Sequence, residues 1–225
     1  VLTENALLGK FHINDITIAA PGCTANPFVG DVVPVQTGTG ISAQFVFVCD
    51  WARLSVMGFS KGIELGTCYY MNLRSCMLVW STDSALSSTG ATHLSVRDSW
   101  FYNCITDLSG FHTVLIEQTD FEPDAPGAPT GAVSGKATIT IGDNTTLRMC
   151  RLEQLNVMSG PRAWVRITGD NNNILGCAIH FIGTSFVPSK AISFTYPIFQ
   201  VDGDNNTIEI TDPSLYAHYA LFTFG

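Results

Sequence analysis

The feature that most constrains this chain is a short apolar pattern that recurs along it. Residues 173–181 place Ile174, Cys177 and Ile179 at offsets of minus three, zero and plus two from the small central residue. A unit that recurs every few tens of residues is typical of a solenoid, in which each unit buries its apolar side chains against its neighbours. The pattern has eight copies: Ile13/Ile16/Ile18, Leu54/Met57/Phe59, Leu73/Cys76/Leu78, Val96/Ser99/Phe101, Ile116/Thr119/Phe121, Leu147/Cys150/Leu152, Ile174/Cys177/Ile179 and Ile208/Thr211/Pro213.

The spacing of these copies indicates stacked β-strands. Successive central positions lie 19 to 41 residues apart, and the runs between them are short, rich in Val, Ile, Thr, Phe and Tyr, and interrupted by Gly, Asn and Ser. We predict an all-β chain, a single right-handed parallel β-helix of about eight coils over residues 1–213, with a bend before each central position. Loops should project at about 21–40, 122–135 and 183–197, and residues 214–225 should form a cap or an interchain contact.

A second repeat predicts a corner shared by three consecutive coils. Gly-Asp-Asn occurs at residues 142–144, 169–171 and 203–205, each time eight residues before a central position. Gly and Asn tolerate positive φ, and Asp and Asn close turns with their own side chains. A corner that carries Asn at the same place in each coil suits a parallel β-helix.

The composition excludes several classes of protein. The net charge is −8 and only 13% of the residues are charged, whereas binding to nucleic acid requires clustered Lys and Arg. No run approaches 18 apolar residues, so we expect no membrane insertion. The P-loop, G-x-S-x-G and H-E-x-x-H motifs are absent from the sequence, and no cofactor is predicted.

The seven cysteines are odd in number and contain no C-x-x-C pair. Cys76, Cys150 and Cys177 fall at the predicted inward position, where a free thiol behaves as a small hydrophobic group. We therefore expect reduced thiols in a protein that folds in a reducing cytoplasm, and no metal site.

Inward aliphatic residues, ladders of small residues and Asn-bearing corners resemble the pectate-lyase-like right-handed β-helix superfamily. Within it, the free cysteines and the low charge look most like bacteriophage tailspike proteins, and the resemblance covers residues 11–213 as a pattern. It implies a homotrimer that is assembled in the bacterial cytoplasm, placed in the virion tail, and binds or cuts bacterial surface polysaccharide such as capsule or O-antigen. A secreted or cell-surface protein is the alternative. The chain is short for a tailspike, so we expect a fragment or a trimmed domain.

The register of the repeats picks out two outward carboxylates. Asp98 and Asp120 should lie one coil apart and two residues apart along the strand, which places them roughly 8 Å from each other. An inverting glycosidase needs carboxyl groups ~6.5–9.5 Å apart, so that a water fits between them. Trp100 and Tyr102 are expected beside this pair as sugar-binding residues, and Glu122 is a substitute for either catalytic role. Surface carboxylates that are neighbours by chance would give the same pattern.

A column of charged residues lies two positions before the central residue, and it predicts either a surface ladder of ion pairs or a strip that binds an acidic sugar. It contains Arg74, Arg97, Glu117 and Arg148, and arginine forks bind carboxylates well. A polysaccharide lyase would instead use a base near an arginine, for which His112 with Arg97 is the candidate.

Three functions therefore remain open. The first is a polysaccharide depolymerase, with glycoside hydrolysis favoured over lyase chemistry. The second is a fibre segment that binds glycan without cutting it, and the third is a β-helix with a purely structural role.

Overall fold

The computed structural model describes residues 8–23, 36–81, 83–122, 137–154, 165–181, 199–215 and 222–224, and every regular element within them is a β-strand. The largest sheet contains β1 (Leu8–Ala19), β3 (Val46–Met57), β5 (Met71–Arg74), β6 (Met77–Ser81), β8 (Ala91–Arg97), β9 (Trp100–Cys104), β11 (Phe111–Glu117), β12 (Asp120–Glu122), β14 (Thr145–Arg148), β15 (Arg151–Gln154), β17 (Asn173–Phe181) and β19 (Thr207–Leu215). In the described ranges, no helix is long and apolar enough to cross a membrane.

Two smaller sheets complete the walls. One contains β2 (Gln36–Ala43), β4 (Phe59–Leu65) and β7 (Ser84–Ser88). The other contains β10 (Thr106–Asp107), β13 (Ile139–Ile141), β16 (Val165–Ile167), β18 (Phe199–Val201) and β20 (Phe222–Phe224). The amide of Ala85 donates a hydrogen bond to the carbonyl of Ile105 at 2.6 Å, which joins the two sheets near β7.

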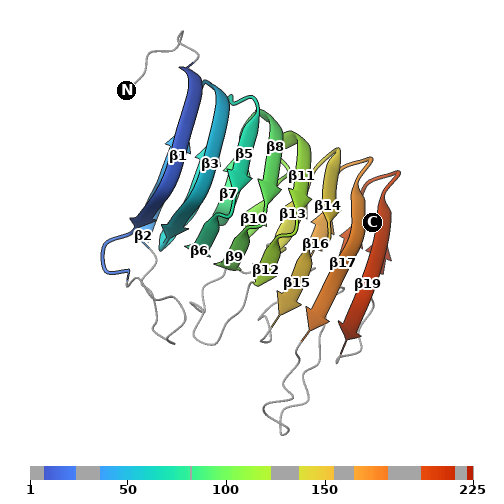
Figure 1. Cartoon of the computed structure of the whole chain (residues 1–225). Coiled ribbons are helices and arrows are strands. Elements are labelled where there is room, and N and C mark those ends of the chain that lie inside the picture. The colour runs from blue at the N-terminus through green and yellow to red at the C-terminus, as the bar shows by residue number, and fades with distance from the viewer. Residues whose placement is uncertain are drawn as a thin grey trace, which may run out of the picture.

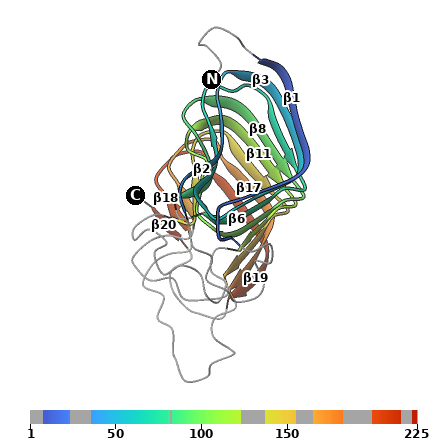
Figure 2. The same ribbon diagram turned by 90° about the vertical axis from the view of Figure 1, so that its left-hand side faces the viewer.

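All paired strands run parallel, and each pairs with the corresponding strand of the next turn of the chain. Strands β1, β3, β5, β8, β11, β14, β17 and β19 lie side by side from blue to red in Figure 1. Viewed along the stack, the strands surround a common axis (Figure 2). The all-β prediction and the parallel strands are therefore confirmed, as a β-helix-like fold. The number of coils and the homotrimer stay predictions.

Three ladders of inward side chains form the core. The first runs through successive strand partners from Ile13 to Ile208, and most of its members are fully buried. Its residues are Ile13, Trp51, Leu73, Val96, Ile116, Leu147, Ile174 and Ile208. The other two ladders occupy the central and plus-two positions of the pattern. The plus-two ladder includes Phe101 and Phe121, which are partners in register and whose rings stack with centroids 4.9 Å apart. Burial of these apolar side chains contributes about 25 cal/mol per Å² removed from water, so the stack is held chiefly by its interior.

The predicted register is correct for the copies from Leu73 to Ile179 and wrong for the second copy. Ile16 pairs with Leu54 rather than with Met57, so the inward residues of that turn are Trp51, Leu54 and Val56. The eighth copy is shifted at its centre, where Cys177 pairs with Ile210 instead of Thr211 because the β17–β19 register changes there.

A bend divides the long wall of the main sheet at a residue with positive φ. These residues occupy the position just before the centre of the pattern: Asp15, Arg53, Ser75, Asp98, Gln118, Met149 and Gly176, with φ between 49° and 60°. The pattern predicts the bend at this position for all of them except Arg53, which precedes the corrected centre Leu54. Where the central residue is Ser, Thr or Cys, its side chain stabilises the bend by donating a hydrogen bond to the carbonyl two residues earlier. Ser99 Oγ bonds to the carbonyl of Arg97 at 2.8 Å, and Thr119 Oγ1 to that of Glu117 at 3.0 Å.

The same contact explains the cysteines at the central position. Cys76 Sγ donates to the carbonyl of Arg74 at 3.5 Å, and Cys150 Sγ to that of Arg148 at 3.5 Å. All cysteines in the described residues are free, and each except Cys23 is buried. The prediction that Cys76, Cys150 and Cys177 face inward as free thiols is confirmed.

The Gly-Asp-Asn corners stack through carboxylates and amides. Asn144, Asn171 and Asn205 have φ between 52° and 59°. Asp143 Oδ1 accepts a hydrogen bond from the backbone N–H of Asp170 at 2.8 Å, and Asp170 Oδ1 accepts one from Asp204 at 2.7 Å. The repeat thus marks a corner in three consecutive turns, as predicted, and Asp carboxylates bond each corner to the next.

The predicted loops lie mostly outside the described residues. That is so for 24–35 of the first loop, for 123–135 of the second and for the whole of the third, 183–197. Glu122, the first residue of the second predicted loop, is the last residue of β12. Strand β2 begins at Gln36, inside the segment predicted as a loop over 21–40. In the predicted cap, Phe222–Phe224 forms β20 and pairs with β18, so this part of the segment continues the wall.

Candidate functional site

A pocket opens on the outer face of the main sheet at the bend. Its volume is about 490 Å³, and it is lined by Ser75, Cys76, Met77, Asp98, Ser99, Trp100, Gln118 and Asp120. In each turn of the chain, the residue with positive φ points outward at the bend: Ser75, Asp98 and Gln118. The first residue of the strand after each bend also lines the pocket: Met77, Trp100 and Asp120. The pocket therefore combines residues from three consecutive turns of the chain.

Asp98 and Asp120 both line this pocket, as their predicted proximity requires. Asp120 pairs with Trp100, and Asp98 lies two residues before Trp100, so the two Cα atoms are roughly 8 Å apart. Asp98 is exposed. Burial raises the pKa of Asp120, and the guanidinium of Arg151, 4.0 Å from its carboxylate, opposes part of that rise. The two carboxyl groups therefore differ in environment, since Asp98 is exposed and Asp120 is half-buried beside Arg151.

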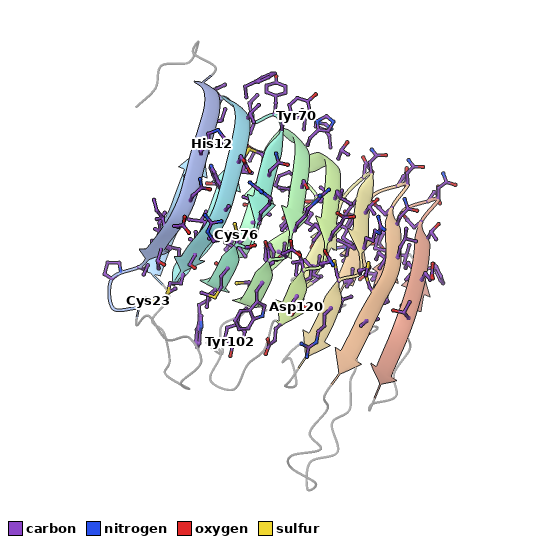
Figure 3. All side chains as sticks on the ribbon, viewed as in Figure 1. His12, Cys23, Tyr70, Cys76, Tyr102 and Asp120 are labelled. Carbon is purple, nitrogen blue, oxygen red and sulfur yellow. The ribbon has the colours of Figure 1, made fainter. Side chains whose placement is uncertain are left out.

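Trp100 lines the pocket and packs against Tyr102, which is buried and is not one of the lining residues, and these two rings form an aromatic wall. Their ring centroids are 5.0 Å apart at an interplanar angle of 52°. Trp100 Nε1 donates a hydrogen bond to Glu122 Oε2 at 3.2 Å, which fixes the orientation of the indole. Burial first, and the charge of Glu122 second, raise the pKa of Tyr102. Tyr102 and Asp120 lie at the lower end of the same face (Figure 3).

Glu122 is thus bonded to the aromatic wall and does not line the pocket with Asp98 and Asp120. Its place beside Trp100 favours a positioning role over the substitute catalytic role predicted from the sequence.

The column of arginines forms ion pairs along the strands. Arg74, Arg97, Glu117 and Arg148 are successive partners in register, as predicted. Glu117 lies between two of them, with Arg97 Nε at 3.2 Å and Arg148 Nη1 at 3.3 Å. Arg74 donates to Asp50 at 3.0 Å. These contacts favour the surface ladder over a strip that is free to bind an acidic sugar.

His112 and Arg97 are not brought together. His112 lies at the start of β11, and the partner of Arg97 is Glu117 at the end of that strand. Five residues of extended chain separate the two positions, which is roughly 16 Å. His112 and Arg97, the pair predicted for lyase chemistry, therefore lie in the same sheet but do not form one site.

The sequence reasoning missed Arg151, although a signal was present. Arg151 directly follows the central residue Cys150, just as Trp100 follows Ser99 and Asp120 follows Thr119. The structure pairs Met77, Trp100, Asp120 and Arg151 in one row across consecutive strands. The row changes from apolar to aromatic, acidic and basic over consecutive strands.

Within the part of the chain that the structure describes, no three His, Cys, Asp or Glu side chains gather as metal ligands would.

The chain was compared with known proteins on this basis. No protein family model, no curated protein and no solved structure matches it.

Proposed function

We propose that this chain is a bacteriophage tailspike-like protein that binds a bacterial surface polysaccharide, capsule or O-antigen, and cleaves it by glycoside hydrolysis. One observation carries the proposal: Asp98, Asp120 and Trp100 line the same pocket on the outer face of a stack of parallel strands. Two carboxyl groups and an aromatic ring are the groups that hydrolysis of a glycosidic bond requires.

The environments of the two carboxyl groups suggest their roles. Asp120 has a raised pKa, so it retains a proton more readily and acts as the general acid on the leaving oxygen. Asp98 is exposed and acts as the general base on a water. Their Cα atoms are roughly 8 Å apart, a spacing that allows the ~6.5–9.5 Å between carboxyl groups that inverting enzymes need. Trp100 presents its ring to a sugar, in an orientation held by Glu122.

The pairing of the arginines favours a neutral glycan and hydrolysis over lyase chemistry. Each arginine of the described residues has a carboxylate within 4.0 Å: Arg53, Arg74, Arg97, Arg148, Arg151 and Arg166. An arginine that is already paired gains less from a uronate carboxylate, since it must break or share its existing contact.

The wider setting belongs to the same proposal. The fold is a right-handed β-helix of about eight coils that assembles as a homotrimer, in the virion tail after folding in the bacterial cytoplasm. Buried free thiols at Cys76, Cys150 and Cys177 are consistent with folding in a reducing compartment.

A binding protein without catalysis is the second candidate. The ion pair between Asp120 and Arg151 favours it, because a salt-bridged carboxylate is also an ordinary feature of a surface.

The proposal is tested by incubating the full chain with purified capsular and O-antigen polysaccharides. A rise in reducing ends without absorbance of an unsaturated uronate is expected for a hydrolase. The absorbance would indicate a lyase. Binding without new reducing ends would support the second candidate and contradict cleavage. A clean monomer in solution would contradict the tailspike assembly.

A further inference from the structure

The outer face of the main sheet carries a second group of side chains, far along the strands from the pocket. This aromatic patch consists of Phe47, Tyr69, Tyr70 and His93. Phe47 is 45% exposed and Tyr70 51% exposed, which places them among the few large hydrophobic side chains exposed in the described structure. Each exposed ring costs free energy in water, so a cluster of them calls for an explanation beyond folding.

The strand register builds the patch. Val46 bridges to Cys68, which places Phe47 beside Tyr69, and Met71 pairs with Leu94, which places Tyr70 beside His93. The rings of Tyr70 and His93 stack with centroids 4.9 Å apart and planes 20° apart. The ring centroid of Phe47 lies 5.8 Å from that of Tyr69 and 6.0 Å from that of Tyr70. The rings are therefore fixed against one another across three turns, in a preformed arrangement.

Polar side chains surround the patch. His93 Nδ1 is within hydrogen-bond distance of Thr92 Oγ1, at 3.1 Å. The next outward row along the strands contains Asp50, Asn72 and Ser95, which are successive partners in register. The carboxylate of Asp50 is paired with Arg74 at 3.0 Å. Flat apolar rings bordered by hydrogen-bonding groups suit a sugar, whose ring has an apolar face and a rim of hydroxyls. A nucleic acid or an acidic protein would need cationic side chains here.

The patch and the pocket are continuous on one face. From His93, strand β8 runs through Ser95 and Arg97 to Asp98, a length of roughly 16 Å. Tyr70 is seen at the upper end of this face, with Asp120 and Tyr102 towards its lower end (Figure 3). An extended oligosaccharide laid along the strands would reach both.

We propose that the aromatic patch is a second glycan-binding site, which holds neutral sugar residues of the same polysaccharide by stacking while a distant bond of that chain lies in the pocket. The inference depends on the proposed function for the identity of the ligand. It assigns binding to Tyr70, His93 and Phe47, none of which contacts the reacting carboxylates.

The test is binding of the full chain to a printed array of bacterial glycans, followed by titration with the best oligosaccharide found. Tyr70→Ala is expected to weaken binding about tenfold, in line with the loss of one stacked ring. Tyr70→Phe keeps the ring and should bind within about twofold of the unaltered chain. Phe224→Ala removes an exposed ring outside the patch and should leave binding unchanged. Asp98→Asn should still bind, because it removes a charge from the pocket and not from the patch.

The outcomes separate this inference from the proposed function. If Tyr70→Ala and His93→Ala bind as well as the unaltered chain while changes in the pocket reduce binding, the patch is not a glycan site and the proposed function stands. If the unaltered chain binds no glycan, both fail. If Tyr70→Ala converts an oligomer into a monomer without any change in glycan affinity, the patch contacts a second copy and the inference is overturned.

Discussion

At the scale of single residues, the position of Asp98 combines backbone strain with exposure. Its φ of 50° places a non-glycine residue in the left-handed region, which costs of order 1 kcal/mol. The neighbouring turns place Ser75 and Gln118 in the same conformation, so the strain belongs to the bend and is not peculiar to the pocket. The carboxylate of Asp98 is nevertheless the one acidic group that this ladder presents to the pocket lining.

The protonation of Asp120 gives the first prediction. Its pKa lies above the ordinary value of 3.8 because burial outweighs the attraction of Arg151. The folded state then holds this proton more tightly than the unfolded state. The contribution of Asp120 to stability is therefore fully present below its unfolded pKa and is lost as the pH rises through its folded pKa. NMR titration of the side-chain carboxyl carbon should show a raised midpoint, and Arg151→Gln should raise it further. A midpoint at or below 3.8 would contradict the burial of this carboxyl group.

At the scale of elements, the bend is held by the small side chain that follows it. Thr119 is fully buried and donates its hydroxyl proton to the carbonyl of Glu117. Thr119→Val keeps the shape but leaves that carbonyl without this donor, so the free energy of unfolding should fall by about 1–2 kcal/mol. Thr119→Cys, which supplies the donor used at Cys76 and Cys150, should lose less. Urea denaturation measures both, and an equal loss in the two variants would rule out the hydrogen bond as the cause.

The register of these elements shows what could be predicted from the sequence. The turns from Leu73 to Ile179, which have an aliphatic residue at minus three, are aligned correctly by the pattern, and with them the row of Trp100 and Asp120. The second turn was misaligned because its inward residue is Trp51, which a pattern restricted to Ile, Leu and Val rejects. The ion pairs of Glu117 could not be predicted either, since they depend on side-chain conformations that register alone does not set.

At the scale of the whole molecule, the turns stack so closely that some positions admit no side chain. A Cβ added at Gly110 would lie 1.8 Å from the carbonyl oxygen of Ser88 in the preceding turn, whereas one added at Gly90 would meet nothing within 4 Å. Gly110→Ala should therefore lower the free energy of unfolding by about 2–3 kcal/mol, because a backbone atom must move. Gly90→Ala is the matched control and should change it by less than about 0.5 kcal/mol. Equal stability of the two variants would contradict the spacing of the turns.

The stack also explains why the pocket was only partly predictable. Repeats in the sequence locate outward residues on neighbouring turns, and Asp98, Trp100 and Asp120 were found in this way. Two other features could not be predicted: the hydrogen bond from Trp100 to Glu122 and the distance between His112 and Arg97. Both depend on how far each strand extends and where it bends, and the spacing of the repeats gives neither.

If Asp98 and Asp120 cleave a glycan together, loss of either carboxyl group should stop cleavage. This is measured as the rate of reducing-end release from a cleaved polysaccharide by the unaltered chain and by Asp98→Asn and Asp120→Asn, with circular dichroism to confirm that each variant is folded. Each substitution is expected to lower the rate by about 10²–10⁴-fold, as loss of a general acid or base does. Full activity in both folded variants would contradict the claim.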